Sequence, residues 1–139
     1  MAASARKRKE VFNTRVEARE RFESRPSLSS LHHEALDRYV MYGLEELLDG
    51  TVRLKCRAET EATIYEAAGG ISVEDIAEVN QRVTIGSGEP EASMLAAVAS
   101  GAATGIPAAR HIVYPGLSHL GPLEQPSRLT LDLLAHTTR

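Results

Sequence analysis

This sequence of 139 residues contains one cysteine and no tryptophan. Because Cys56 is the single cysteine, an internal disulfide and a cysteine cluster for metal are both excluded. Tryptophan is absent and aromatic residues make up 4% of the chain, which argues against a base-stacking surface for single-stranded nucleic acid. We therefore expect no disulfide framework and no metal site.

Long apolar runs and a basic excess are missing as well. No stretch approaches the ~18 apolar residues of a membrane-spanning helix. No apolar segment follows the basic residues 6–9 to form a signal peptide. The net charge of -3 argues against a general nucleic-acid binder. We expect a cytoplasmic protein that binds neither nucleic acid nor membrane, with residues 6–9 in a solvated, poorly ordered end.

The first half of the chain has mainly helical patterns. Thr14 and Glu17 have capping-box spacing ahead of a predicted helix over 15–24. Apolar residues three and four apart predict a second helix over 33–43, and a third is expected over 59–68. Between these two, alternating apolar residues predict a short strand over 52–56 that places Cys56 on its buried face as a small core residue.

The second half alternates strand and helix. After a short helix near 73–79, apolar runs predict strands over 83–87 and 110–114, with an alanine-rich helix over 92–103 between them and a last helix starting near Pro126. This order is typical of the α/β class with a parallel sheet. A sheet of only two parallel strands would leave two unpaired edges. The pattern therefore indicates the edge of a larger sheet, completed by a longer parent chain or by a second polypeptide.

Candidate chemical groups follow both parallel strands. Functional groups gather where parallel strands end, and Glu91 follows the first strand while His119 follows the second. A carboxylate bonded to one imidazole nitrogen would leave the other nitrogen to act as a general base. We interpret Glu89 as a surface residue and His111 as structural. The segment Gly86-Ser87-Gly88 has neither the lysine of a phosphate loop nor the third glycine of a dinucleotide fingerprint, so no cofactor is expected.

Two segments resemble the α/β-hydrolase family. The run Y-P-G-L-S-H-L-G-P-L-E-Q-P, residues 114–126, is similar to the family's histidine loop, and V-T-I-G-S-G-E-P-E, residues 83–91, is similar to the strand and turn before it. The resemblance implies that His119 is the catalytic histidine and Glu91 the acid of a triad. It also implies that residues 1–70 form a helical cap and that residues 71–139 form the C-terminal α/β part of the core.

The chain departs from that family at two points. Position 91 is Glu where the family usually has Asp, and no G-x-S-x-G occurs in the sequence. The nucleophile elbow and oxyanion loop of the family belong upstream of these segments, and acyl transfer needs both. The expectation is therefore the C-terminal half of a serine hydrolase, acting on a small ester or similar acyl substrate once an N-terminal half completes it.

Whether the chain is an enzyme by itself stays open at this point. One alternative is a non-catalytic interaction module that pairs with a partner chain or with its own copy through the open sheet edge. The other is a truncated hydrolase remnant without an independent function.

Overall fold

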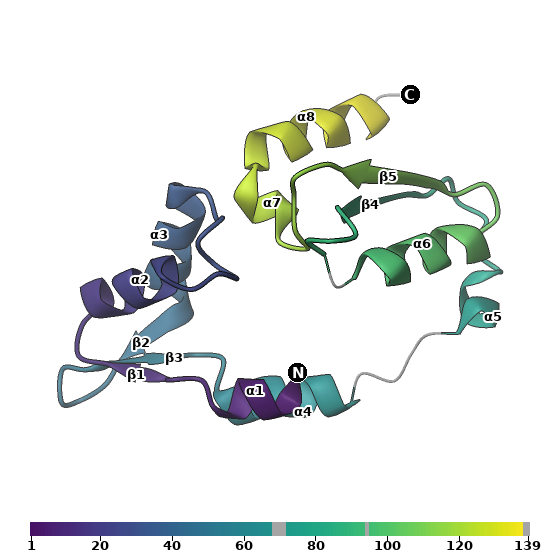
Figure 1. Ribbon diagram of the computed structural model, residues 1–139. Coiled ribbons are helices and arrows are strands. Elements are labelled where there is room, and N and C mark those ends of the chain that lie inside the picture. Colours follow the sequence, from purple (N-terminus) through teal and green to yellow (C-terminus); the bar gives the residue numbers. More distant parts are fainter. Residues whose placement is uncertain (68–71, 94, 138–139) are drawn as a thin grey trace. The chain divides into compact units, whose positions relative to one another are not determined.

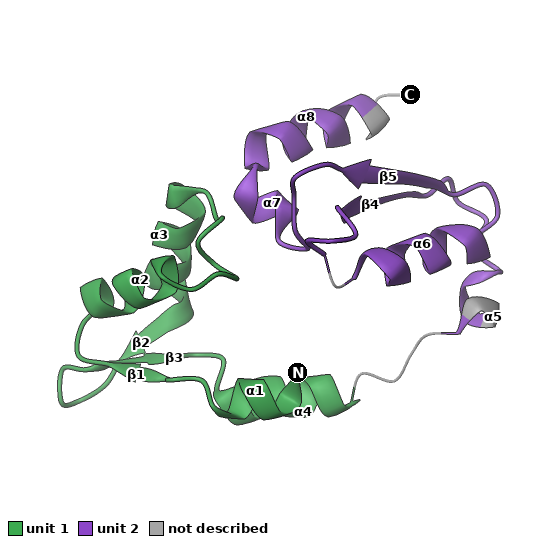
Figure 2. Ribbon diagram, viewed as in Figure 1, with its two compact units in different colours: residues 1–70 green, residues 71–139 purple. Residues whose placement is uncertain are grey.

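The computed structural model describes residues 1–67, 72–93 and 95–137. The chain divides into two compact units, residues 1–70 and residues 71–139 (Figure 2). Their assignment to a cap and to part of a hydrolase core stays a prediction. Within the described residues, no helix is both long and apolar enough to cross a membrane.

Unit 1 contains four helices and a small antiparallel sheet among its described residues (Figure 1). The three strands lie in the order β1-β3-β2, and Val52 of β3 is in register with Phe12 of β1 and Glu46 of β2. In chain order the elements are α1 (Ala2–Arg6), β1 (Val11–Phe12), α2 (Arg15–Glu23), α3 (His33–Gly43), β2 (Leu44–Glu46), β3 (Val52–Leu54) and α4 (Ala58–Ala67).

The core of unit 1 lies between its sheet and the helices α2 and α3. Phe22 of α2 packs edge-to-face against Phe12 of β1 and Tyr39 of α3, with ring centroids 5.4 and 5.2 Å apart. The predicted cap of α2 is present in part. The Thr14 hydroxyl accepts the Glu17 amide at 3.1 Å, but the Glu17 carboxylate accepts from the Asn13 amide rather than from Thr14.

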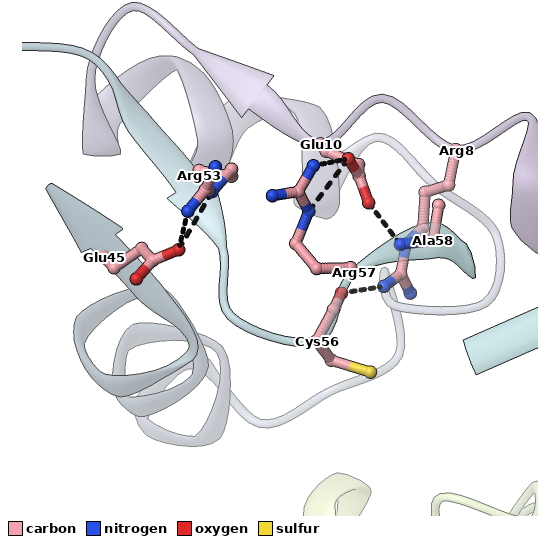
Figure 3. Close-up of polar contacts among 7 residues, drawn as sticks. All are labelled: Arg8, Glu10, Glu45, Arg53, Cys56, Arg57 and Ala58. Atoms are coloured by element: carbon pink, nitrogen blue, oxygen red, sulfur yellow. Dashed lines mark hydrogen bonds and ion pairs between the residues drawn. The ribbon is translucent and has the colours of Figure 1, made fainter. Parts of the chain in front are cut away.

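The expectation that Cys56 is buried was wrong. Strand β3 ends at Leu54, and the Cys56 side chain is exposed. Contacts from the N-terminal segment turn the chain here: Arg8 donates to the Cys56 carbonyl at 3.2 Å, and the Glu10 carboxylate accepts from the Ala58 amide (Figure 3). The partners lie about 48 positions away in the sequence, so the period-two pattern gave no sign of the turn.

The basic segment 6–9 is also more ordered than expected. Arg6 ends helix α1 and forms ion pairs with Glu59 at 2.8 Å and with Glu66 at 2.6 Å, both on α4. Arg8 pairs with Glu61 at 2.7 Å, and Lys9 with Glu17 at 2.5 Å. Three of the four basic residues of this segment are thus paired with carboxylates of unit 1.

Unit 2 is built on two parallel strands. Strand β4 (Thr84–Gly88) pairs with β5 (Arg110–Tyr114) in a register that runs from Thr84 opposite Arg110 to Gly88 opposite Tyr114. Figure 1 shows α6 (Ala96–Gly105) on one side of the strand pair and α8 (Pro126–Thr137) on the other. Two short helices complete the unit, α5 (Val73–Ile76) and α7 (Gly121–Glu124). The α/β class predicted from the sequence is confirmed.

Candidate functional site

His119 lies in the loop that follows the carboxyl end of β5. Its side chain is exposed and lines a hollow of about 350 Å³ within unit 2. The neighbouring Ser118 and the ring of Tyr114 line the same hollow. An exposed imidazole at the end of a parallel strand can exchange protons with a bound molecule, as general acid–base chemistry requires.

Glu91, the predicted triad acid, lies in the turn after β4 with an exposed side chain. No hydrogen bond or ion pair joins it to His119, although the structure describes both residues. It is also absent from the wall of the hollow. The structure therefore places both residues after neighbouring strands, as expected, but does not bring their side chains together.

A buried carboxylate that the sequence analysis did not single out holds the histidine loop. Glu124, in the last position of α7, is 9% exposed. Its Oε2 accepts the Ser118 amide at 2.8 Å and its Oε1 accepts the Ser118 hydroxyl at 2.6 Å. The Ser118 Oγ in turn accepts the Leu120 amide at 3.0 Å. The residues on both sides of His119 are thus fixed by one network.

Strand β4 holds the beginning of the same loop. The Glu89 amide donates to the Leu117 carbonyl at 2.8 Å, and the Glu89 carboxylate accepts the Gly116 amide at 3.0 Å. Gly88 lies so close that an added Cβ would be 2.4 Å from the carbonyl oxygens of Leu117 and Ser118. Glu89, which is partly exposed, is therefore bound to the histidine loop.

A serine and a histidine also meet between the two strands. The Ser87 Oγ lies 2.9 Å from the His111 Nε2, and the Ser87 side chain is 9% exposed. The imidazole satisfies a hydroxyl that would otherwise be buried without a partner. This contact agrees with a structural role for His111. In the sequence, the sign of this contact is one polar residue, Ser87 or His111, within each of two neighbouring apolar strands.

The phenol of Tyr114 is another polar group at the hollow. Burial raises the pKa of Tyr114 above its ordinary value of 10.0, and the carboxylate of Asp132 on α8 raises it further. The Arg128 guanidinium lies 5.5 Å from the centre of the Tyr114 ring and acts in the opposite direction on this pKa. Tyr114 is consequently a neutral hydroxyl near neutral pH.

The described residues contain no group of three or more histidine, cysteine, aspartate or glutamate side chains that could hold a metal ion. The polar side chains in the wall of the hollow are an imidazole, several hydroxyls and the carboxylate of Asp132.

Two parallel strands between helices are consistent with part of an α/β-hydrolase fold. Two solved structures have this fold. E-2-(acetamidomethylene)succinate hydrolase superposes with a TM-score of 0.76 at 18% identity, over 97% of this chain and 50% of that one. The peroxisomal α/β-hydrolase Lpx1 of Saccharomyces cerevisiae superposes with a TM-score of 0.78 at 17% identity, over 98% of this chain and 38% of that one.

The chain thus spans half or less of the length of these two hydrolases. The match is consistent with the predicted C-terminal part of the fold. No protein-family model and no curated protein sequence matches the chain.

Proposed function

We propose that this chain provides the histidine-bearing part of an α/β-hydrolase that cleaves an ester or similar acyl bond. His119 would accept the proton of an attacking serine hydroxyl and then give it to the leaving group. The serine and the donors that stabilise the oxyanion would come from an N-terminal half that contains the nucleophile elbow. The observation that supports this most is the exposed His119 on a loop fixed by Glu124 and Glu89.

Glu91 is the proposed orienting acid. Its support is its place after β4, one strand away from the loop of His119. Because the two side chains are not bonded, the proposal requires the turn that contains Glu91 to move toward the imidazole when the site is completed.

The test uses this chain together with a half that contains G-x-S-x-G, and measures hydrolysis of a p-nitrophenyl ester. His119→Ala should lower kcat/KM by about 10²–10⁴, the usual contribution of a general acid–base group. His33→Asn is the matched control, since His33 is an exposed histidine at the start of α3 in unit 1 and is not in the wall of the hollow. Unchanged hydrolysis in His119→Ala would overturn the proposal. Glu91→Gln in the same assay tests whether the Glu91 carboxylate orients His119.

A second candidate is a non-catalytic interaction module. The two-stranded sheet of unit 2 favours it, because each strand has only one partner strand in the described part of the chain. A completed complex that forms but does not hydrolyse esters would select this alternative.

A further inference from the structure

The histidine loop begins with a tight turn over residues 114–117. The Leu117 amide donates to the Tyr114 carbonyl at 3.2 Å, which closes a four-residue turn. Gly116 has a φ of 77°, and the proline ring keeps the φ of Pro115 negative. This combination of signs defines a type II turn, from which the chain continues to His119.

The central peptide of this turn, between Pro115 and Gly116, can take two orientations. Type I and type II turns differ by roughly 150° in the ψ before this peptide and by roughly 170° in the φ after it, so the peptide rotates by about half a turn between them. Proline is common at the second position of both types. Gly116 has no Cβ, so neither sign of its φ is penalised. The local sequence therefore permits both orientations, and contacts from elsewhere in the fold select one.

Two side chains of opposite charge bind the two ends of this peptide. The Gly116 N–H donates to the Glu89 Oε2 at 3.0 Å, and the Arg128 Nη1 donates to the Pro115 carbonyl at 3.4 Å. The N–H and the C=O of a trans peptide point in opposite directions, so Glu89 and Arg128 bind it from opposite sides. In a type I turn the carbonyl would face the carboxylate and the N–H would face the guanidinium, and both contacts would become repulsive.

Both charged side chains are held beside the turn by further contacts. Arg128 lies in the first turn of α8, where a helix favours negative rather than positive charge, so the helix itself does not account for its position. Its guanidinium donates to the Gln125 Oε1 at 3.3 Å and lies 5.5 Å from the centre of the Tyr114 ring. Glu89 is anchored through its backbone, because its amide donates to the Leu117 carbonyl at 2.8 Å.

We propose that Glu89 and Arg128 are a positioning pair for His119, which holds the Pro115–Gly116 peptide in the type II orientation. The type II turn keeps the histidine loop bound to the end of β4, whereas a rotated peptide would be repelled by the Glu89 carboxylate. The consequence for catalysis rests on the proposed function. The orientation of the peptide does not, and it can be measured in this chain without a reaction.

The test is NMR of the 139-residue chain, which reads the turn type directly. In a type II turn the Pro115 Hα lies close to the Gly116 amide proton, and the nuclear Overhauser effect between them is about tenfold stronger than in a type I turn. We expect the strong signal in the wild-type chain. Reversal of both charges, Glu89→Lys with Arg128→Glu, should weaken it about tenfold, because the reversed pair attracts the rotated peptide. Two charges that only attracted each other would be restored by this exchange and would leave the signal strong.

The matched control makes the same two charge changes elsewhere in unit 2. Glu78 and Arg110 are exposed, and within the described residues neither side chain binds the turn. Glu78→Lys with Arg110→Glu should therefore keep the strong signal. The amide signals of Ser118 and His119 should shift in the Glu89→Lys, Arg128→Glu chain and stay in place in the control, since the turn leads directly into these residues.

A second pair of variants guards against misfolding of the charge-reversed chain. Glu89→Ala removes the acceptor and should raise the hydrogen-exchange rate of the Gly116 amide about tenfold, whereas Glu89→Gln keeps a carbonyl acceptor and should raise it less. A weak signal in the wild-type chain, a strong signal after charge reversal, unshifted Ser118 and His119 amides, or equal exchange in Glu89→Ala and Glu89→Gln would each overturn the proposal. None of these measurements uses hydrolysis, so failure of the proposed function would leave their results unchanged.

Discussion

The buried carboxylate of Glu124 accepts hydrogen bonds from both the amide and the hydroxyl of Ser118, at 2.8 and 2.6 Å. Ser118 immediately precedes His119, so the Glu124 side chain fixes the backbone position on the N-terminal side of the histidine. The Leu120 amide, on the far side of His119, reaches the same network through the Ser118 hydroxyl. The geometry of the histidine loop therefore depends on a residue that touches no part of the hollow.

Glu124→Ala should destabilise the histidine loop, since it leaves the Ser118 amide without its acceptor. We expect a loss of about 1–3 kcal/mol in the free energy of opening, because a buried polar group without a partner costs about that much. Glu124→Gln retains one carbonyl acceptor and should lose less. Hydrogen exchange of the Ser118 and Leu120 amides measures the free energy of opening in both variants. Glu91→Ala is the control, and equal exchange in Glu124→Ala and Glu91→Ala would contradict the role of Glu124.

Gly88 of β4 is a second position at which a larger side chain would disturb the histidine loop. In Gly88→Ala the new Cβ would lie 2.4 Å from two loop carbonyl oxygens, which forces the histidine loop away from β4. Overpacking of this kind costs about 1–3 kcal/mol. Gly101→Ala is the matched control, because a Cβ at Gly101 of α6 meets nothing within 4 Å. That change should stabilise α6 by about 0.5–1 kcal/mol. Urea unfolding of both variants should show a lower free energy of unfolding for Gly88→Ala and a higher one for Gly101→Ala.

The sequence was sufficient for the elements whose signals are local. Strand β5 has the predicted bounds, and β4 is displaced by one residue, because each is a short apolar run bounded by turn residues. The helix between them begins at Ala96 rather than at 92. Its N-cap is Leu95, which provides no side-chain hydrogen bond, so no capping residue marked its start in the sequence.

The site was predictable only where a motif stands in the sequence. His119 was found from the residues around it. The bond from Gly116 to Glu89 spans 27 positions, and no spacing rule connects residues that far apart. Glu124 is near His119 in sequence, but its burial depends on how α7 packs. The end of β3 before Cys56 has the same cause, because the contacts from Arg8 and Glu10 are tertiary.

Acid should weaken unit 1 through Glu10. The Arg57 guanidinium and then the Ala58 amide hold the pKa of Glu10 below its ordinary value of 4.5. A carboxyl whose pKa is lower in the folded chain stabilises the fold above its unfolded pKa. That contribution is lost as the pH falls from about 4.5 through the folded value.

Glu10→Gln should therefore remove part of the acid dependence of unit 1. Unfolding by urea, followed through the signals of the Phe22 ring between pH 7 and pH 3, measures the effect. The wild-type chain should lose stability below the ordinary pKa, and Glu10→Gln should lose less over the same interval while being less stable at neutral pH. Parallel pH curves for the two proteins would show that Glu10 has no such role.

Tyr114 should ionise above the ordinary tyrosine pKa of 10.0, because the anionic phenolate is disfavoured by burial and by the nearby Asp132 carboxylate. Asp132→Asn removes a negative charge and should lower the pKa of Tyr114. Arg128→Gln removes a positive charge that lies 5.5 Å from the ring and should raise it. Carbon NMR of tyrosine labelled at Cζ resolves each residue, and Tyr39 in unit 1 is the internal control. If both substitutions moved the pKa of Tyr114 in the same direction, a change in burial rather than charge would be controlling it.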